Sequence, residues 1–292
     1  MNRAMLAMVS TAFLLVNAYP QQQVGTGAQQ HITTDAQAQA AIEANTNVIE
    51  STFKVVGNNV TGSGFILARP YTQAGRQHYR HVLVTAAHML TLNEGEFVTV
   101  WFRRRTANGT WEQLPTQVMI RNGATPLWQQ HPRADVAVIY VTVPDGVLPG
   151  DGISTDTLAD DVTLRSYGIH PGDEVRCDGF PLSVGGPFGF PILRTGRIAS
   201  YPILPSAETK TFLLDFPVFP GNSGGPAYIA YDAFRNTGDG KFVAYGGNKL
   251  TIVGLVSGEK IVANRIPLGI AEIVHATLIS ETIAQLPPPE HQ

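Results

Sequence analysis

Short apolar runs separated by turn-forming residues dominate the chain from residue 52 onward. The first series of runs comprises Phe53–Val56, Gly64–Ala68, His81–Thr85, Phe97–Arg104, Thr110–Ile120 and Val136–Val143. Their length and their content of β-branched residues are typical of β-strands. Between two of these runs, Ala107-Asn108-Gly109 predicts a hairpin turn.

A second series follows a connector at residues 146–165 that is rich in Pro, Gly and Asp. Its runs are Glu174–Gly179, Pro191–Ser200, Thr211–Phe216, Ala227–Ala230, Phe242–Tyr245 and Leu250–Ser257. Two sets of about six short strands predict an all-β fold made of two antiparallel six-stranded β-barrels.

Two segments have helical rather than alternating spacing. The first is Asp35 to about Ile49, and the second is Ile270–Leu286, which Pro287-Pro288-Pro289 ends. The predicted organisation is a signal peptide (1–18), a Gln-rich leader (19–47), a first barrel (48–145), the connector (146–165), a second barrel with a C-terminal helix (166–286) and a tail (287–292).

The N-terminus has the pattern of an export signal. Arg3 precedes an apolar run from Ala4 to Val16, and Val16-Asn17-Ala18 offers small residues for cleavage after Ala18. A buried N-terminal helix is the alternative interpretation. No later stretch reaches the roughly 18 apolar residues of a membrane span. We therefore expect a secreted or periplasmic protein without a stable membrane anchor.

Composition narrows the class further. Hydrophobic residues make up 43% of the 292 residues and charged residues 15%, which excludes a disordered chain. A single cysteine excludes a disulfide scaffold, and a net charge of −3 argues against a nucleic-acid partner. We interpret Arg103-Arg104-Arg105 as part of a solvated surface strand. The 29 Gly and 20 Pro fit the many turns of two barrels.

Three residues could carry nucleophilic chemistry. Ser223 lies in Pro220-Gly221-Asn222-Ser223-Gly224-Gly225-Pro226, where glycines let backbone N–H groups approach a carbonyl. His88 ends the apolar run Leu83–Ala87, and Asp135 precedes the run Val136–Ile139. A carboxylate beside a histidine can select its tautomer. Each residue taken alone has a structural interpretation as well: a turn serine, a structural histidine and a strand-initiating aspartate.

Order and spacing strengthen the chemical interpretation. His88, Asp135 and Ser223 occur in that order, 47 and 88 residues apart. Here the chain resembles the trypsin-like (chymotrypsin-fold) serine peptidases, most closely the exported bacterial branch that lacks a PDZ domain. The resemblance covers roughly residues 48–286. It rests on Thr61-Gly62-Ser63-Gly64-Phe65, Thr85-Ala86-Ala87-His88, Asp135-Val136-Ala137-Val138, Gly221–Pro226 and Gly254-Leu255-Val256-Ser257-Gly258.

The resemblance implies a serine endopeptidase that acts on a protein or peptide without metal or cofactor. Ser223 would be the nucleophile, His88 the general acid and base, and Asp135 the residue that orients His88. The N–H groups of Gly221 and Ser223 would form the oxyanion hole, and Ser257 would support Asp135. Such a mechanism predicts activity that falls as pH drops through the imidazole range near ~6.5.

The resemblance also implies where substrate binds. Val218, Val256, Ser257 and Gly258 would line the primary pocket, with Val256–Glu259 as the edge strand that pairs with substrate. The segments Pro217–Pro220 and Val256–Gly258 contain no acid, so a small or apolar side chain is the expected preference.

The chain departs from many animal members of the family before the nucleophile. Asn222 stands where those members have an Asp that holds a freed N-terminal amine. We therefore expect activity that does not depend on that type of zymogen cleavage. The chain ends about six residues after the predicted helix, so we expect no PDZ domain.

Three alternatives stay open at this stage. The first is a secreted, non-catalytic binding module on the same fold. Gly221–Gly225 also matches the G-x-S-x-G elbow of α/β-hydrolases, with Asp232 or Asp239 and His275 as partners, although helices and parallel strands do not alternate along this chain. A nucleophilic Cys177 is the third, but a small buried thiol in a strand is the more usual interpretation.

Overall fold

The computed structural model describes residues 34–231, 234–236, 242–244, 249–262 and 266–289. The chain divides into residues 1–34 and a compact unit of residues 35–292. The predicted signal peptide and the first part of the Gln-rich leader therefore lie outside the described residues, as do Asp232 and Asp239.

Eight strands form the first sheet, in the order β5-β4-β1-β2-β3-β9-β8 with β10 beside β2. Six of them have four or more residues, and β8 and β10 have two each. They are β1 (Thr52–Val56), β2 (Thr61–Gln73), β3 (Arg76–Thr85), β4 (Phe97–Arg105), β5 (Trp111–Met119), β8 (Gln129–Gln130), β9 (Ala137–Tyr140) and β10 (Ile153–Ser154). Only the β10–β2 pair is parallel among the strand pairs of the described chain.

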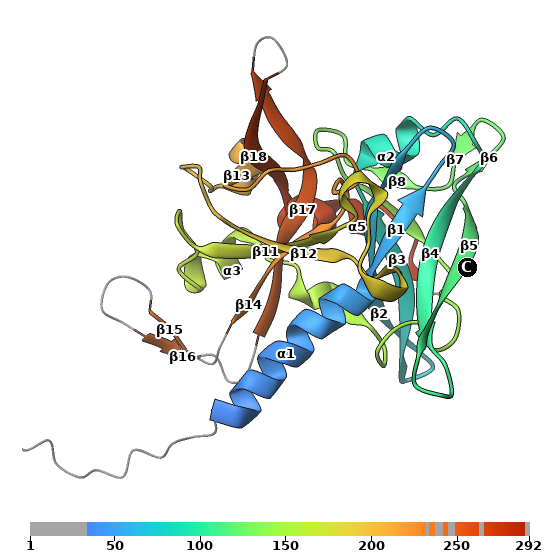
Figure 1. Ribbon diagram of the computed structural model, residues 1–292, viewed down its shortest axis with the longest axis horizontal. Coiled ribbons are helices and arrows are strands. Elements are labelled where there is room, and N and C mark those ends of the chain that lie inside the picture. The colour runs from blue at the N-terminus through green and yellow to red at the C-terminus, as the bar shows by residue number, and fades with distance from the viewer. Residues whose placement is uncertain (1–33, 232–233, 237–241, 245–248, 263–265, 290–292) are drawn as a thin grey trace, which may run out of the picture. The chain divides into compact units, whose positions relative to one another are not determined.

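Six strands form the second sheet, in the order β12-β11-β14-β17-β18-β13 (Figure 1). They are β11 (Glu174–Gly179), β12 (Ile192–Arg197), β13 (Thr211–Leu214), β14 (Pro226–Tyr231), β17 (Lys249–Val262) and β18 (Ile266–His275). A bridge between Ile198 and Leu214 joins its two edges and closes it into a barrel. The predicted chymotrypsin-like fold of two antiparallel barrels with a C-terminal helix is confirmed. An α/β-hydrolase architecture is excluded by the antiparallel sheets.

Two predictions about the second barrel are wrong in detail. The run at Phe242–Tyr245 supplies β16 (Phe242–Ala244), which pairs with β15 (Phe234–Asn236) outside the barrel. The barrel strand is β18 instead, so Ile270–His275 is strand rather than helix. The C-terminal helix α5 spans only Ala276–Ala284. Pairing with β17 and β13 on both sides outweighs the helical spacing of this segment.

Short helices connect the strands. The predicted helix near residues 35–49 is confirmed as α1 (Thr34–Ser51), which runs directly into β1 (Figure 1). The remaining elements are α2 (Ala87–Thr91), β6 (Arg121–Asn122), β7 (Thr125–Pro126), η1 (Thr155–Thr157), α3 (Asp161–Ser166), η2 (Pro181–Ser183), η3 (Pro187–Gly189) and α4 (Ser206–Thr209). The predicted turn at Ala107–Gly109 is also confirmed: Thr106 N–H donates to Thr110 O at 2.7 Å.

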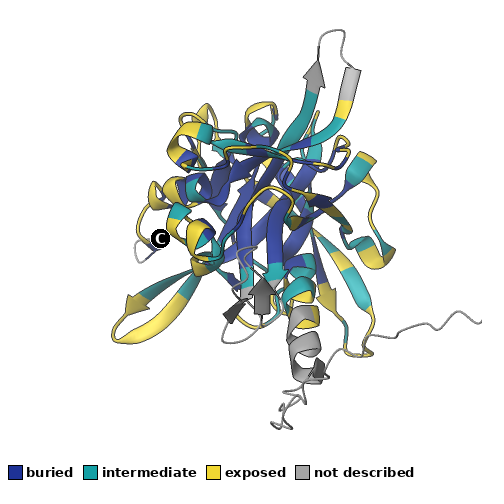
Figure 2. Cartoon of the chain, turned by 90° about the vertical axis from the view of Figure 1, so that its left-hand side faces the viewer, coloured by how far each residue is buried: buried dark blue, intermediate teal, exposed yellow. Residues whose placement is uncertain are grey.

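Both faces of the central strand β2 are buried, which explains its continuous apolar run. Ile66 belongs to the core of the first barrel. Phe65 and Leu67 point the other way and join a core that continues through the second barrel. Figure 2 shows that buried residues are concentrated in the central strands of the chain. The two barrels therefore pack through apolar side chains, and this contact fixes the strand ends that carry the candidate site.

Arg103 is buried, so its interpretation as part of a solvated surface strand is wrong; Arg104 and Arg105 are exposed as expected. Its guanidinium donates to the carbonyls of Thr52, Gly189, Ile49 and Glu50 at 2.6–3.3 Å. Three of these carbonyls are at or just beyond the C-terminus of α1, where the helix dipole favours a cation. Burial lowers the pKa of Arg103 to about 9, against the opposing effect of Glu50 and Asp178.

Arg103→Ala is expected to lower the free energy of unfolding by roughly 3 kcal/mol. The substitution leaves buried carbonyls without a donor and removes the cation between the rings of Phe53 and Phe190. Urea unfolding followed by fluorescence measures the effect. Arg104→Ala is the matched control, because its exposed pair with Glu112 contributes about 1 kcal/mol or less. Equal stability of the two variants would contradict the anchoring role of Arg103.

Candidate active site

His88 is held at the start of α2, directly after the buried end of β3. Ala86 and Ala87 are 0% and 2% exposed, and their small side chains allow the chain to turn between strand and helix. Leu92 N–H donates to His88 O at 3.0 Å, which fixes the backbone of the helix. The imidazole is therefore placed at the end of a buried strand, while its side chain remains 36% exposed.

Asp135 binds His88 at two points. One carboxylate oxygen, Oδ2, lies 2.8 Å from His88 Nδ1, and the other, Oδ1, accepts the His88 backbone N–H at 2.9 Å. Because an ionised carboxylate only accepts, this geometry puts the imidazole proton on Nδ1 and leaves Nε2 free to take a proton.

Ser257 completes this arrangement from the second barrel. Its hydroxyl donates to Asp135 Oδ2 at 2.7 Å. The register of β17 against β18 shifts between Val256 and Gly258, and such irregularities re-aim a side chain. Burial would raise the pKa of Asp135, but the hydrogen bonds from His88 and Ser257 outweigh it and lower that pKa below its ordinary value. The carboxylate therefore stays ionised near neutral pH.

Glycines shape the loop that carries Ser223. Gly221 has φ +102°, and a Cβ there would lie 2.1 Å from Phe180 O. Gly224 has φ +86°, and a Cβ there would lie 2.1 Å from Ser63 O. Larger residues would break this packing. The Ser223 hydroxyl donates to Ser257 O at 3.0 Å, and no hydrogen bond joins it to His88 in the described part of the chain.

Two backbone donors on the loop of Ser223 have no acceptor among the described residues. The N–H groups of Gly221 and Ser223 donate no hydrogen bond to any described residue. Unpaired amides are uncommon in folded proteins, and two of them beside a serine could bind one substrate oxygen. The structure thus brings together the predicted residues His88, Asp135, Ser257 and the loop of Gly221 and Ser223.

Ser63 is a site residue whose part the sequence reasoning missed. Its side chain is fully buried, and its hydroxyl donates to Gly221 O at 2.7 Å. Its own N–H donates to Ser223 O at 2.8 Å, and Phe180 N–H donates to its hydroxyl at 3.1 Å. The first barrel therefore holds the loop of Ser223 through one residue. Its place in the motif Thr61–Phe65 was the available signal.

The predicted substrate-binding residues lie on the loop and on β17. Both backbone polar groups of Val256 are hydrogen-bonded to the loop of Ser223: Gly224 N–H donates to Val256 O, and Val256 N–H donates to Gly225 O. Pairing of β17 with β14 ends at Leu255, so Ser257–Glu259 keep one edge free of any described strand. Gly258 would have open space around a Cβ, whereas Val218 is buried.

A small void with no room for a water molecule lies beneath the loop. Asp178, Asn222, Phe216 and Val256 are among the residues that line it. The two carboxylate oxygens of Asp178 have no hydrogen-bond partner within the described residues. The amide nitrogen of Asn222 also lacks one there. Burial raises the pKa of Asp178 to about 7, although the Tyr228 hydroxyl, Arg103 and Arg176 lower it. Cys177 on the same strand is buried, and burial raises the pKa of its thiol, which disfavours a nucleophilic role.

The free energy of unfolding should fall as pH rises from about 4 to about 7, because of Asp178. In this window the unfolded carboxyl, with an ordinary pKa of 3.8, loses its proton while the folded one keeps it, so rising pH favours unfolding. Asp178→Asn removes this slope. The free energy of unfolding of the wild type should drop relative to Asp178→Asn by at most about 4 kcal/mol across the window.

Urea unfolding at a series of pH values measures that difference. Comparison with the variant cancels other groups, including His275, whose pKa burial lowers to about 4. The exposed Asp215→Asn is the control and should leave the slope unchanged. Parallel profiles for the wild type and Asp178→Asn would show that Asp178 titrates at its ordinary pKa.

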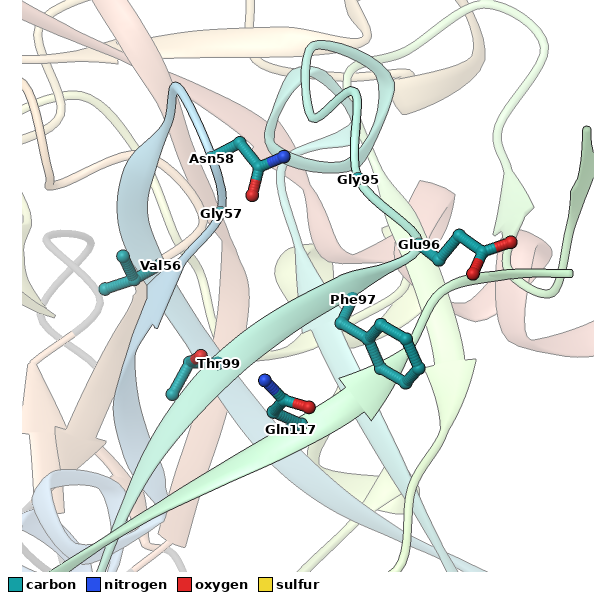
Figure 3. Close-up of a pocket in the computed structure, with 8 residues that line it drawn as sticks. All are labelled: Val56, Gly57, Asn58, Gly95, Glu96, Phe97, Thr99 and Gln117. Carbon is teal, nitrogen blue, oxygen red and sulfur yellow. The ribbon is translucent and has the colours of Figure 1, made fainter. Parts of the chain in front are cut away.

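Two larger cavities are open to solvent. One, of about 410 Å³, borders His88 and Asp135 and is also lined by Thr91 and Arg133. The other, of about 380 Å³, lies on the first barrel, and its polar side chains include Asn58, Thr99 and Gln117 (Figure 3). No cluster of three or more His, Cys, Asp or Glu that could hold a metal ion occurs among the described residues.

Comparison with protein-family models and with curated proteins finds no match. The chain resembles solved structures, among them two of Rv3671c. One is Rv3671c from M. tuberculosis H37Rv, a serine-to-alanine mutant in an inactive form, with a TM-score of 0.43 and 15% identity over 85% of this chain and 92% of that chain. The other is Rv3671c protease, also inactive, with a TM-score of 0.44 and 17% identity over 86% of this chain and 96% of that chain.

Proposed function

We propose that the protein is an exported serine endopeptidase that cleaves peptide bonds through an acyl-enzyme on Ser223. The observation that carries the proposal is the continuous set of hydrogen bonds from Ser257 to Asp135 to His88, next to a serine on a glycine-shaped loop. This set fixes the tautomer of His88 and leaves Nε2 as the base. The trypsin-like class, expected from the sequence, fits this chemistry.

The reaction has two halves. Ser223 Oγ attacks the substrate carbonyl carbon while His88 Nε2 takes the hydroxyl proton, and the N–H groups of Gly221 and Ser223 stabilise the oxyanion. Collapse breaks the C–N bond, and His88 gives its proton to the leaving amine. A water molecule, deprotonated by His88, then attacks the ester, and Ser223 regains the proton. No step requires a metal or a cofactor.

The first step needs a change of hydrogen-bond partner at Ser223. Its hydroxyl donates to Ser257 O, and rotation about the Cα–Cβ bond is the smallest movement that could turn it toward His88. Catalytic hydrogen bonds are often long or misaligned before substrate binds. The same contact favours the second candidate, a non-catalytic binding module on this fold, in which Ser223 would stay bonded to Ser257.

The substrate is a protein or peptide with a small or apolar side chain before the scissile bond. Val218 and Val256 are themselves buried, so the preference rests on the sequence: no acid occurs at residues 217–220 or 256–258 to attract Lys or Arg. The free edge of Ser257–Glu259 can pair with the acyl segment of the substrate as an added strand. Export is supported by the apolar run of residues 4–16. No described helix is long and apolar enough to cross a membrane.

A serine-reactive organophosphorus probe separates the two candidates. The peptidase should be labelled at Ser223 in its folded state, as mass spectrometry of the digested protein would show. Denatured protein is the control. A folded protein that the probe leaves unmodified would support the binding module.

A further inference from the structure

A strongly apolar loop lies against the loop of Ser223. It spans Phe180–Phe190, and we name it the apolar loop. Leu182, Val184 and Phe188 are 64%, 56% and 52% exposed, although each could be buried at a gain in free energy. Exposed large apolar side chains gathered on one short loop commonly mark a binding surface.

Both ends of the apolar loop are anchored. At one end Phe180 is buried, and its N–H donates to the Ser63 hydroxyl. At the other end Arg103 donates to Gly189 O at 2.9 Å, and the Phe190 ring packs edge-on against Trp111. Although the apolar loop belongs to the second barrel, the first barrel therefore holds it. The exposed side chains are presented by a fixed backbone.

The backbone of the apolar loop is strained at three residues. Leu182, Ser183 and Phe188 have φ values of +51°, +64° and +58°, in a region that side-chain-bearing residues rarely adopt. Such conformations cost free energy and gather at functional sites. A turn that served only as a connection could use glycine at these positions, without exposing leucine and phenylalanine.

The apolar loop is bonded to the segment just before Ser223, whereas β17 is bonded to the residues just after it. Leu182 N–H donates to Pro220 O at 2.6 Å, directly before the oxyanion donor Gly221. Val256 is bonded to Gly224 and Gly225, which follow Ser223. An extended substrate that places its acyl segment on the free edge of β17 must leave past Gly221. The first two substrate residues after the scissile bond then lie within about 7 Å of that bond, since a strand rises about 3.4 Å per residue.

We propose that Leu182 and Val184 bind apolar side chains at the first two positions on the leaving-group side of the substrate. The proposal rests on the peptidase function above and adds a second determinant of substrate choice. The preferred substrates would be polypeptides with apolar residues on both sides of the cleaved bond, as in unfolded chains and exposed strands. A folded protein with a polar surface would be a poor substrate.

The test compares substrates that share one acyl segment. One set contains quenched fluorescent peptides with Leu-Phe or Ser-Asp after the scissile bond. The reference is the nitrophenyl ester of the same acyl segment, whose leaving group has no amino acid. Leu182→Asn tests the loop, because asparagine tolerates positive φ while it removes the apolar surface. Val162→Ser, on the exposed face of α3, is the matched control.

Leu182→Asn should lower kcat/KM for the Leu-Phe peptide roughly tenfold, the effect of partly exposing one apolar side chain. The Ser-Asp peptide and the ester should change by less than about twofold, as should every substrate with Val162→Ser. An equal loss on the ester would overturn the proposal, since Leu182 would then act on the loop of Ser223. An unchanged preference for Leu-Phe would overturn it as well.

Two further outcomes have different meanings. If no substrate, the ester included, is hydrolysed by the wild type, the peptidase function fails rather than the part played by the apolar loop. In that case anisotropy of a labelled Leu-Phe peptide still tests whether Leu182→Asn weakens binding. Binding of the wild type to phosphatidylcholine vesicles, lost in Leu182→Asn without any change in peptide preference, would identify the apolar loop as a membrane contact and overturn the proposal.

Discussion

Ser223→Ala is expected to reduce peptide hydrolysis on the order of a million-fold. Alanine has no oxygen to form the acyl-enzyme, so only the oxyanion donors and substrate binding would remain, and removal of the nucleophile in such a triad has an effect of this size. Initial rates on a quenched fluorescent peptide at high enzyme concentration measure the loss. Free energy of unfolding should change by less than about 1 kcal/mol, because the hydroxyl makes one hydrogen bond, to Ser257 O.

The comparison variant is Ser257→Ala. It removes the donor to Asp135 but keeps the nucleophile, so its activity should lie between those of the wild type and Ser223→Ala. Peptide hydrolysis retained by a pure Ser223→Ala protein would rule out the acyl-enzyme mechanism. Equal, complete inactivity of the wild type and Ser223→Ala, with unchanged peptide binding, would instead identify a non-catalytic binding module.

Asp135→Asn should lower kcat about ten-thousand-fold. Asp135 accepts three hydrogen bonds, two of them from His88 and one from Ser257. An asparagine has one acceptor oxygen and an NH₂ group that only donates, so at least one of these contacts is lost. If the NH₂ group faces His88 Nδ1, that nitrogen must become the acceptor. The proton then moves to Nε2, where it blocks the base.

The rate of labelling by the organophosphorus probe should fall in parallel with kcat in Asp135→Asn, while KM changes little. This pattern separates a defect in the base from a defect in substrate binding. Ser223→Ala in the same background should cause little additional loss, because the residues act as one unit. A kcat within tenfold of the wild type would show that Asp135 does not set the tautomer of His88.

The sequence allowed much of the fold to be predicted where local pattern and tertiary structure agree. The alternating runs and the turn at Asn108-Gly109 identified most barrel strands, and a glycine-rich motif pointed to the loop of Ser223. The helix predicted for Ile270–His275 was wrong, because a helical spacing of apolar residues also fits a strand that is buried between two neighbouring strands. Pairing partners far along the chain decided the outcome.

The contacts that hold the candidate site were harder to predict. Ser63 is 160 residues from Ser223, and only the packing of two barrels reveals that its N–H reaches Ser223 O. Arg103 looked like a surface charge, since strand pattern alone does not show that carbonyls at and just beyond the end of α1 converge on its guanidinium. Such contacts depend on how elements meet, and a single sequence carries little information about that.

Because of the contacts of Ser63, the geometry of the candidate catalytic loop depends on the relative position of the two barrels. The loop belongs to the second barrel by sequence, yet the first barrel fixes its carbonyls at Gly221 and Ser223. Each barrel could retain its secondary structure after slight separation, while the N–H groups of Gly221 and Ser223 would lose their alignment. Turnover would then disappear before circular dichroism reported any unfolding, so loss of activity and loss of structure would be two separate transitions.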